Sequence, residues 1–109
     1  MTEQVMPPRL NQELDRLWNQ FLPQIGERVA VLEAAGSNLA VGGLTDHQRN
    51  GAQAAAHKLA GVLGTFGLIK GTILAREAER LCSGNADAAS IAQLADIARQ
   101  LRSLVNERT

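Results

Sequence analysis

The stretch AASIAQLADIARQLRSLVN, residues 88–106, decides the fold class of this 109-residue chain. Its apolar residues recur every three or four positions, which is the spacing of one face of an α-helix. The stripe consists of Ile91, Leu94, Ala95, Ala98, Leu101 and Val105. Asp87 directly precedes the stretch and is predicted to cap this helix. A stripe of this kind has to be buried against other elements, so further helices are expected.

Two helical segments are predicted at the N-terminal end of the chain. Pro7 and Pro8 can begin a helix over about 8–21, because the first turn of a helix leaves amides unpaired and proline lacks one. Its stripe is Leu10, Leu14, Leu17 and Phe21. Pro23 is predicted to end or bend this helix. A second segment, marked by Ile25, Val29 and Leu32, is predicted to reach about Leu39, and Gly42 and Gly43 close it.

Two more helices are predicted in the middle of the chain. Thr45 and Gln48 have the spacing of a capping box, which predicts a helix beginning there and running to about Phe66. Another helix is predicted over about 68–82, and Ser83, Gly84 and Asn85 supply its stop. Its apolar stripe is Ile69, Ile73, Leu74, Ala78 and Leu81.

These segments predict an all-α fold, an antiparallel up-down four-helix bundle with an additional short N-terminal helix. Amphipathic helices joined by short turns bury their stripes by packing side by side. The length suits a single domain over 1–109, and residues 1–7 are expected to be flexible.

The composition excludes several classes of partner. Eleven basic residues balance eleven acidic ones, so neither a nucleic acid nor an anionic membrane surface is expected as a partner. No stretch has the roughly 20 apolar residues of a membrane span, and the N-terminus lacks the pattern of a secretory signal. Cys82 is the only cysteine, which excludes an internal disulfide and indicates a reducing compartment. A cytoplasmic location is expected.

The predicted helix over 45–66 has a polar face centred on His57. At about 100° per residue, the apolar residues gather on the side opposite this histidine. They are Ala55, Leu59, Val62, Leu63 and Phe66, and we expect them to face the core. The near side lacks large apolar residues and consists of Asn50, Gln53, Ala54, Ala60, Gly61 and Gly64. The sequence therefore predicts that His57 points to solvent from a helix face that has no large apolar side chains around it.

Gly61 and Gly64 lie one and two turns beyond His57, and they can be interpreted in two ways. Each glycine inside a helix costs about 0.5–1 kcal/mol relative to alanine, so a compensating role is expected. Missing side chains beside an exposed imidazole would let another protein approach the ring, as direct group transfer requires. Alternatively, the glycines let a neighbouring helix of this chain pack closely. A lone exposed histidine is also often only a solvated side chain.

The segment from Ala56 to Leu68 resembles the signature of histidine phosphotransfer (HPt) domains. The family pattern is His-x-x-Lys-Gly followed by a second glycine six residues later, and His57, Gly61 and Gly67 occupy the matching positions. The resemblance extends more loosely from about residue 9 to the C-terminus. It implies that His57 is phosphorylated by a receiver-domain aspartate and passes the phosphoryl group to another receiver, in a two-component phosphorelay.

One position departs from the family pattern, because Ala60 stands where the family has lysine. Lys58 is a candidate substitute, although it lies about 100° round the helix from His57. Lys70 and Arg76 are further candidates. The resemblance aligns Glu79 with a position whose side chain often hydrogen-bonds the histidine ring, which would hold the Nδ1 proton and leave Nε2 free as the nucleophile. Lys58 and Glu79 can also be interpreted as solvated charges.

The expected protein is a phosphocarrier, with no kinase or phosphatase centre of its own. No cofactor is expected, and Mg²⁺ is assigned to the partner receiver domain. A metal site is not expected, because His47 and His57 are ten residues apart with no third ligand in a known spacing. Leu68 and Ile69 are candidates for the docking surface, and a monomer is expected. The alternative is an adaptor bundle that binds a receiver or kinase without carrying phosphate.

Overall fold

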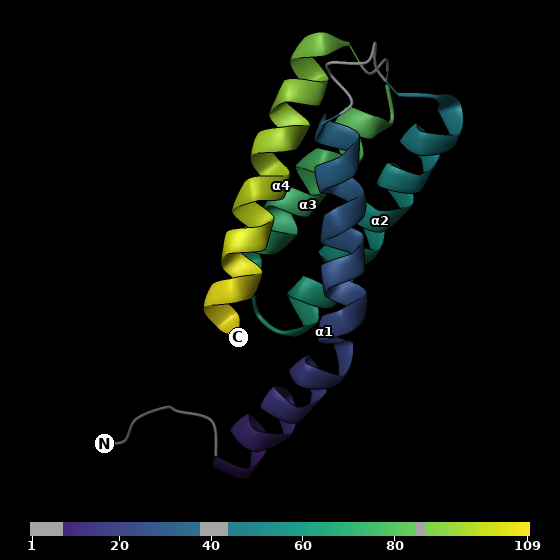
Figure 1. Ribbon diagram of the computed structural model, residues 1–109. Coiled ribbons are helices and arrows are strands. Elements are labelled where there is room, and N and C mark those ends of the chain that lie inside the picture. Colours follow the sequence, from purple (N-terminus) through teal and green to yellow (C-terminus); the bar gives the residue numbers. More distant parts are fainter. Residues whose placement is uncertain (1–7, 38–43, 85–86) are drawn as a thin grey trace.

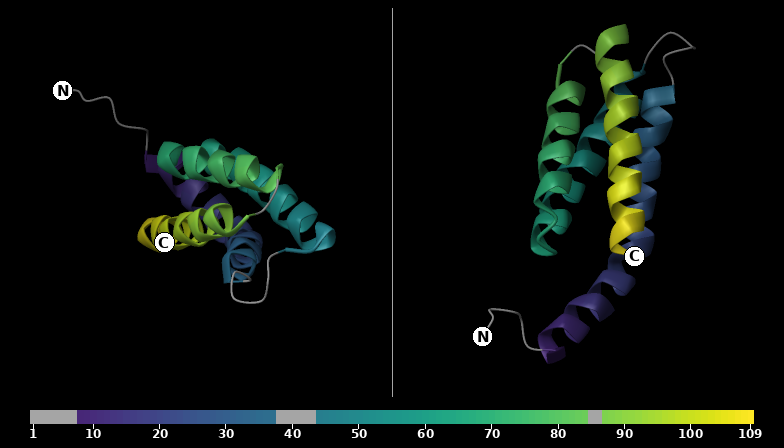
Figure 2. Two further views of the ribbon diagram at one scale, coloured as in Figure 1. Left: turned by 90° about the horizontal axis from the view of Figure 1, so that it is seen from above. Right: turned by 90° about the vertical axis from the view of Figure 1, so that its left-hand side faces the viewer.

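The computed structural model describes residues 8–37, 44–84 and 87–109 of the chain. The described residues contain the helices α1 (Pro8–Ser37), α2 (Asp46–Thr65), α3 (Ile69–Cys82) and α4 (Ala88–Arg108). Successive helices run in opposite directions, and α1 and α3 each pack against both α2 and α4 (Figure 1, Figure 2). The predicted all-α antiparallel bundle is confirmed.

The segment predicted as an additional N-terminal helix is not a separate element. Residues 8–37 form one helix, with Pro23 inside it. A proline removes one donor and crowds the carbonyl four residues earlier, here that of Asn19, but a helix can continue past it with a bend. The N-terminal part of α1 runs past the end of the other helices at an angle to the rest of α1 (Figure 2).

This protruding part of α1 buries one large side chain. Trp18 is buried, whereas Leu17 and Phe21 of the predicted stripe are partly exposed because few neighbours surround them. The Trp18 ring makes an edge-to-face contact with Phe66, with 5.2 Å between centroids, and the Arg108 guanidinium lies 5.2 Å from the Trp18 centroid. These contacts attach α1 to the C-terminal ends of α2 and α4.

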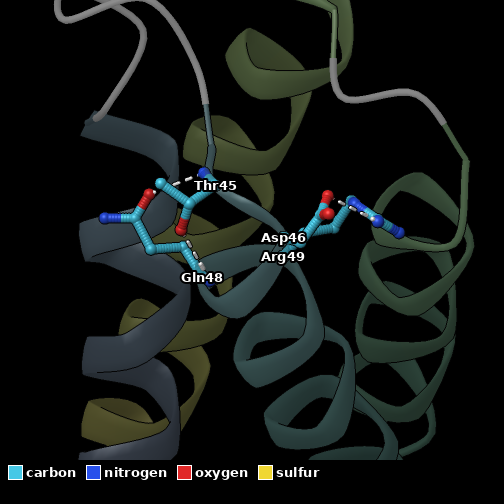
Figure 3. A network of polar contacts seen from close by, with 4 residues as sticks. All are labelled: Thr45, Asp46, Gln48 and Arg49. Atoms are coloured by element: carbon cyan, nitrogen blue, oxygen red, sulfur yellow. Dashed lines mark hydrogen bonds and ion pairs between the residues drawn. The ribbon is translucent and has the colours of Figure 1, made fainter.

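The first turn of α2 has the predicted capping box (Figure 3). The backbone amide of Gln48 donates to Thr45 Oγ1 over 3.1 Å, and the amide of Thr45 donates to Gln48 Oε1 over 2.9 Å. Arg49 also pairs with Asp46 over 3.1 Å. At α4, Asp87 accepts from the amide of Ser90 as predicted, and this bond holds the pKa of the Asp87 carboxyl below its usual value.

The core confirms most of the predicted stripes. In α4, all six predicted residues are buried except Ala95, which is half-buried, and Ile97 joins them. Ala55, Leu59 and Leu63 of α2 are buried, while Val62 and Phe66 pack half-buried against the core.

The predicted stripe of α3 is wrong at Ile69 and Ile73. These side chains are 70% and 62% exposed, because the buried face of α3 is made of smaller residues. Its buried residues are Gly71, Ala75, Ala78, Leu81 and Cys82. Gly71 shows how closely α3 approaches α2, since a Cβ on it would lie 2.9 Å from Leu63 Cδ1. Burial raises the pKa of the Cys82 thiol.

Some predictions fall outside the residues or side chains that the structure describes. They are the flexible segment 1–7, the side chain of Leu10, the helix end near Leu39 with Gly42 and Gly43, and the stop residue Asn85.

Helices α1 and α4 cross closely at Gly36. A Cβ on Gly36 would lie 2.6 Å from the Cα of Ala95, which is backbone and cannot move aside cheaply. The Gly36→Ala variant should therefore lose about 1–3 kcal/mol of unfolding free energy, measured by urea denaturation followed by circular dichroism.

Gly51→Ala in α2 is the matched control, because a Cβ at Gly51 would have nothing within 4 Å. This variant should gain about 0.5–1 kcal/mol, the ordinary preference of a helix for alanine. Equal changes in the two variants would contradict the close crossing at Gly36.

Candidate functional site

His57 lies on the exposed face of α2, where its side chain is 73% exposed. Asn50, Ala54, Gly61 and Gly64 share this exposed face, and Gln53 is half-buried. The described residues of this face carry no large apolar side chain close to the ring, as the sequence predicted. The imidazole is therefore open to a second molecule.

Glu79 of α3 holds the inner edge of the ring. Its Oε2 lies 3.0 Å from His57 Nδ1, and the Glu79 side chain is 29% exposed. In the neutral ring, a proton on Nδ1 donates to this carboxylate and leaves the lone pair on Nε2. Nε2 has no hydrogen-bond partner among the described residues. The contact therefore selects both the tautomer and the orientation of the ring.

The three glycines that follow His57 differ in their surroundings. A Cβ on Gly61 would have nothing within 4 Å, so packing within the chain does not explain this glycine. A Cβ on Gly64 would lie 3.3 Å from Thr72 Oγ1, so close packing of α3 accounts for it at least in part. The two interpretations of the glycine pair thus apply to different residues.

Gly67 ends α2 with a left-handed backbone, φ 74°. Its amide donates to the carbonyl of Gly64, and the amide of Leu68 donates to that of Leu63, which is the Schellman pattern of a helix C-terminus. At a rise of 1.5 Å per residue, Gly67 lies ~15 Å from His57 along the helix axis. Gly67 is therefore a turn residue and does not lie next to His57.

The prediction that Ala60 lies on the exposed face is wrong. Ala60 is only 3% exposed, and Thr72 Oγ1 donates to its carbonyl over 3.1 Å. The reason is that α3 covers this flank of α2, so the buried face of α2 is wider than the apolar stripe indicated. Ala56 beside it is buried as well.

Several charged residues surround the histidine at greater distance. Lys58, Lys70 and Arg76 are exposed, and none of the three has an ion pair among the described residues. His47 lies exposed in the first turn of α2, ten residues or ~15 Å before His57. The two histidines therefore do not form one site.

Ile69 and Ile73 form an exposed apolar pair on α3, near the helix that carries His57. Ile73 was missed as a surface residue, although Gly71, Ala75 and Ala78 indicate a buried face of small residues on the other side. Leu68, the other docking candidate, is half-buried.

The described residues contain no cluster of three or more potential metal ligands. Their helices also include none with the length and apolar character needed to cross a membrane.

Comparison with known proteins assigns the chain to a family. The family model of the Hpt domain matches residues 16–108, nearly the whole chain. Protein RcaC from Microchaete diplosiphon is 38% identical over 71 residues, which cover 65% of this chain and 11% of that protein. No solved structure gives a significant match. The chain therefore belongs to the Hpt domain family.

Proposed function

We propose that His57 is the residue that carries the phosphoryl group, accepting it from a receiver-domain aspartate and passing it to another receiver. The contact of Glu79 with His57 Nδ1 supports this assignment above the others, because it leaves Nε2 of an exposed ring without a hydrogen-bond partner among the described residues. His47 has no such partner among the described residues.

The transfer is a nucleophilic displacement at phosphorus. The Nε2 lone pair of the neutral ring attacks the phosphorus of the aspartyl phosphate, and an N–P bond forms. The bond from phosphorus to the aspartate oxygen breaks, and its electron pair leaves on the aspartate carboxylate. The phosphorylated ring becomes positively charged and keeps its Nδ1 proton in the hydrogen bond to Glu79, whose negative charge offsets this charge. The reverse sequence delivers the group to the next receiver.

The domain contributes a nucleophile and a docking surface, and the receiver contributes the rest of the chemistry. Phosphoryl transfer depends mainly on positioning and charge neutralisation, and the Mg²⁺ that provides much of this belongs to the receiver. We therefore assign this domain no cofactor and no kinase or phosphatase activity of its own. It acts as a monomer, and the buried thiol of Cys82 fits a cytoplasmic compartment.

The docking surface proposed for the receiver comprises the exposed backbone at Gly61, next to His57, and the exposed apolar pair Ile69 and Ile73 of α3. Gly61 lets the partner backbone approach the ring, because no neighbouring side chain lies within 4 Å of its missing Cβ. Exposed isoleucines on the neighbouring helix supply apolar area that a partner can cover.

The His57→Gln variant should accept no phosphoryl group from a phosphorylated receiver. Glutamine keeps the polarity of the side chain but lacks a nucleophilic nitrogen. The measurement is transfer of ³²P from the receiver, with His47→Gln as the control that should be labelled like the parent.

Equal labelling of the His57→Gln variant would refute the assignment of His57. If no label appears in the parent but receiver binding persists in both variants, the domain is an adaptor. Acid-labile, base-stable label on the parent supports a phosphoramidate.

Gly61→Ala should stabilise the fold and slow the transfer. The exposed helix gains about 0.5–1 kcal/mol, while the new methyl group keeps the receiver from its closest approach. We expect the rate of transfer from a phosphorylated receiver to fall by roughly 10- to 100-fold, since small displacements of reacting atoms have effects of this size.

Gly51→Ala is the control for Gly61→Ala, because it should gain similar stability without slowing the transfer. The small donor phosphoramidate needs no docking surface, so it should label the Gly61→Ala variant at the parent rate. Unchanged transfer from the receiver would remove Gly61 from the docking surface.

A further inference from the structure

Two contacts fix how α3 is aligned with α2 around the histidine. Thr72 Oγ1 donates to the Ala60 carbonyl over 3.1 Å, and Glu79 Oε2 lies 3.0 Å from His57 Nδ1. Moving from Thr72 to Glu79 along α3 therefore corresponds to moving from Ala60 back to His57 along α2. A residue of α3 between these two contacts is level with the turn of α2 that runs from His57 to Ala60.

Arg76 occupies this intermediate position. It follows Thr72 by four residues and precedes Glu79 by three, so it lies one helical turn from each, on the same side of α3. Its Cα is displaced by ~4.5 Å along α3 from that of Glu79, in the direction of Thr72 and of the Ala60 carbonyl. Arg76 is exposed, so its long side chain can extend from this position towards the exposed ring of His57.

The charge of Arg76 is available for a ligand. Arg76 is exposed and has no ion pair or hydrogen bond to another described residue. By contrast, Arg80 on the next turn of α3 makes two contacts with Glu77, which raise the pKa of its guanidinium.

The other unpaired cations near α2 point elsewhere. Lys58 lies about 100° round α2 from His57. Lys70 is nine residues before Glu79, which places it about 180° away on the opposite side of α3. Among the described residues, Arg76 is the unpaired cation on the side of α3 that faces the ring.

We propose that Arg76 binds the phosphoryl group on His57 and supplies from α3 the positive charge that Ala60 does not supply from α2. This inference rests on the proposed phosphorylation of His57. A phosphoryl group brings a charge of about −1.5 to −2 and three acceptor oxygens, and a guanidinium can donate to two of them at once. Glu79 contacts Nδ1 of the ring, and Arg76 binds the oxygens of the phosphoryl group on Nε2.

The test labels the intact protein with phosphoramidate, which phosphorylates histidine without a docked receiver. The ³¹P resonance of phospho-His57 is then titrated in the parent and in the variants Arg76→Ala, Arg76→Lys, Arg99→Ala and Lys58→Ala. Arg99 of α4 is an exposed arginine paired with Asp96, away from α2, so its removal changes the net charge equally.

Loss of Arg76 should raise the pKa of the second phosphoryl ionisation by about half a unit, a shift of the size expected for an exposed ion pair. Arg76→Lys should retain part of the parent value, and Arg99→Ala should match the parent. Coincident titrations of parent and Arg76→Ala would overturn the assignment of Arg76, as would an equal shift in Lys58→Ala. Absence of ³¹P label on His57 in the parent would instead overturn the proposed function and this inference together.

Discussion

The close packing of α3 against α2 is the constraint on which the site depends. Gly71 brings the backbone of α3 so near that a Cβ there would lie 2.9 Å from Leu63 Cδ1, and Thr72 donates to a carbonyl of α2. At this separation the side chain of Glu79 reaches His57 Nδ1 over 3.0 Å. The small buried residues of α3 therefore help to bring Glu79 to the histidine.

The face of α2 around His57 combines two opposing requirements. A stable helix favours alanine over glycine at exposed positions, and α2 has alanine at the exposed position 54, but it keeps glycine at the open position one turn after the histidine. Within the described residues no internal contact compensates for Gly61, which suits a surface shaped for another molecule. Gly67, the second glycine of the motif, ends α2, and Gly64 is explained at least in part by the close packing of α3.

The sequence predicted those features of the structure that depend on the pattern of residues within a single helix. The capping box at Thr45 and Gln48, the cap at Asp87 and the exposed side of α2 all follow from spacing along one helix. Properties that depend on a second helix were harder to predict. Ala60 is buried because α3 covers it, and Ile69 and Ile73 are exposed because α3 presents its small residues to the core. The family resemblance, rather than periodicity, brought Glu79 into the site.

The continuity of α1 is another property that local sequence did not predict, because it depends on packing against other helices. Pro23 carries a strong local signal for a break, but one missing amide does not outweigh the packing of the helix on both sides of it. The bend lets the first part of α1 leave the bundle while Trp18 remains packed against Phe66.

The most direct test of this account identifies the ring nitrogen that bears the phosphoryl group. The ¹⁵N-histidine protein is phosphorylated, and ¹⁵N–³¹P and ¹H–¹⁵N couplings are recorded by NMR. We expect phosphorus bonded to Nε2 of His57, with the proton retained on Nδ1. Phosphorus on Nδ1, or on His47, would contradict the role assigned to the contact with Glu79.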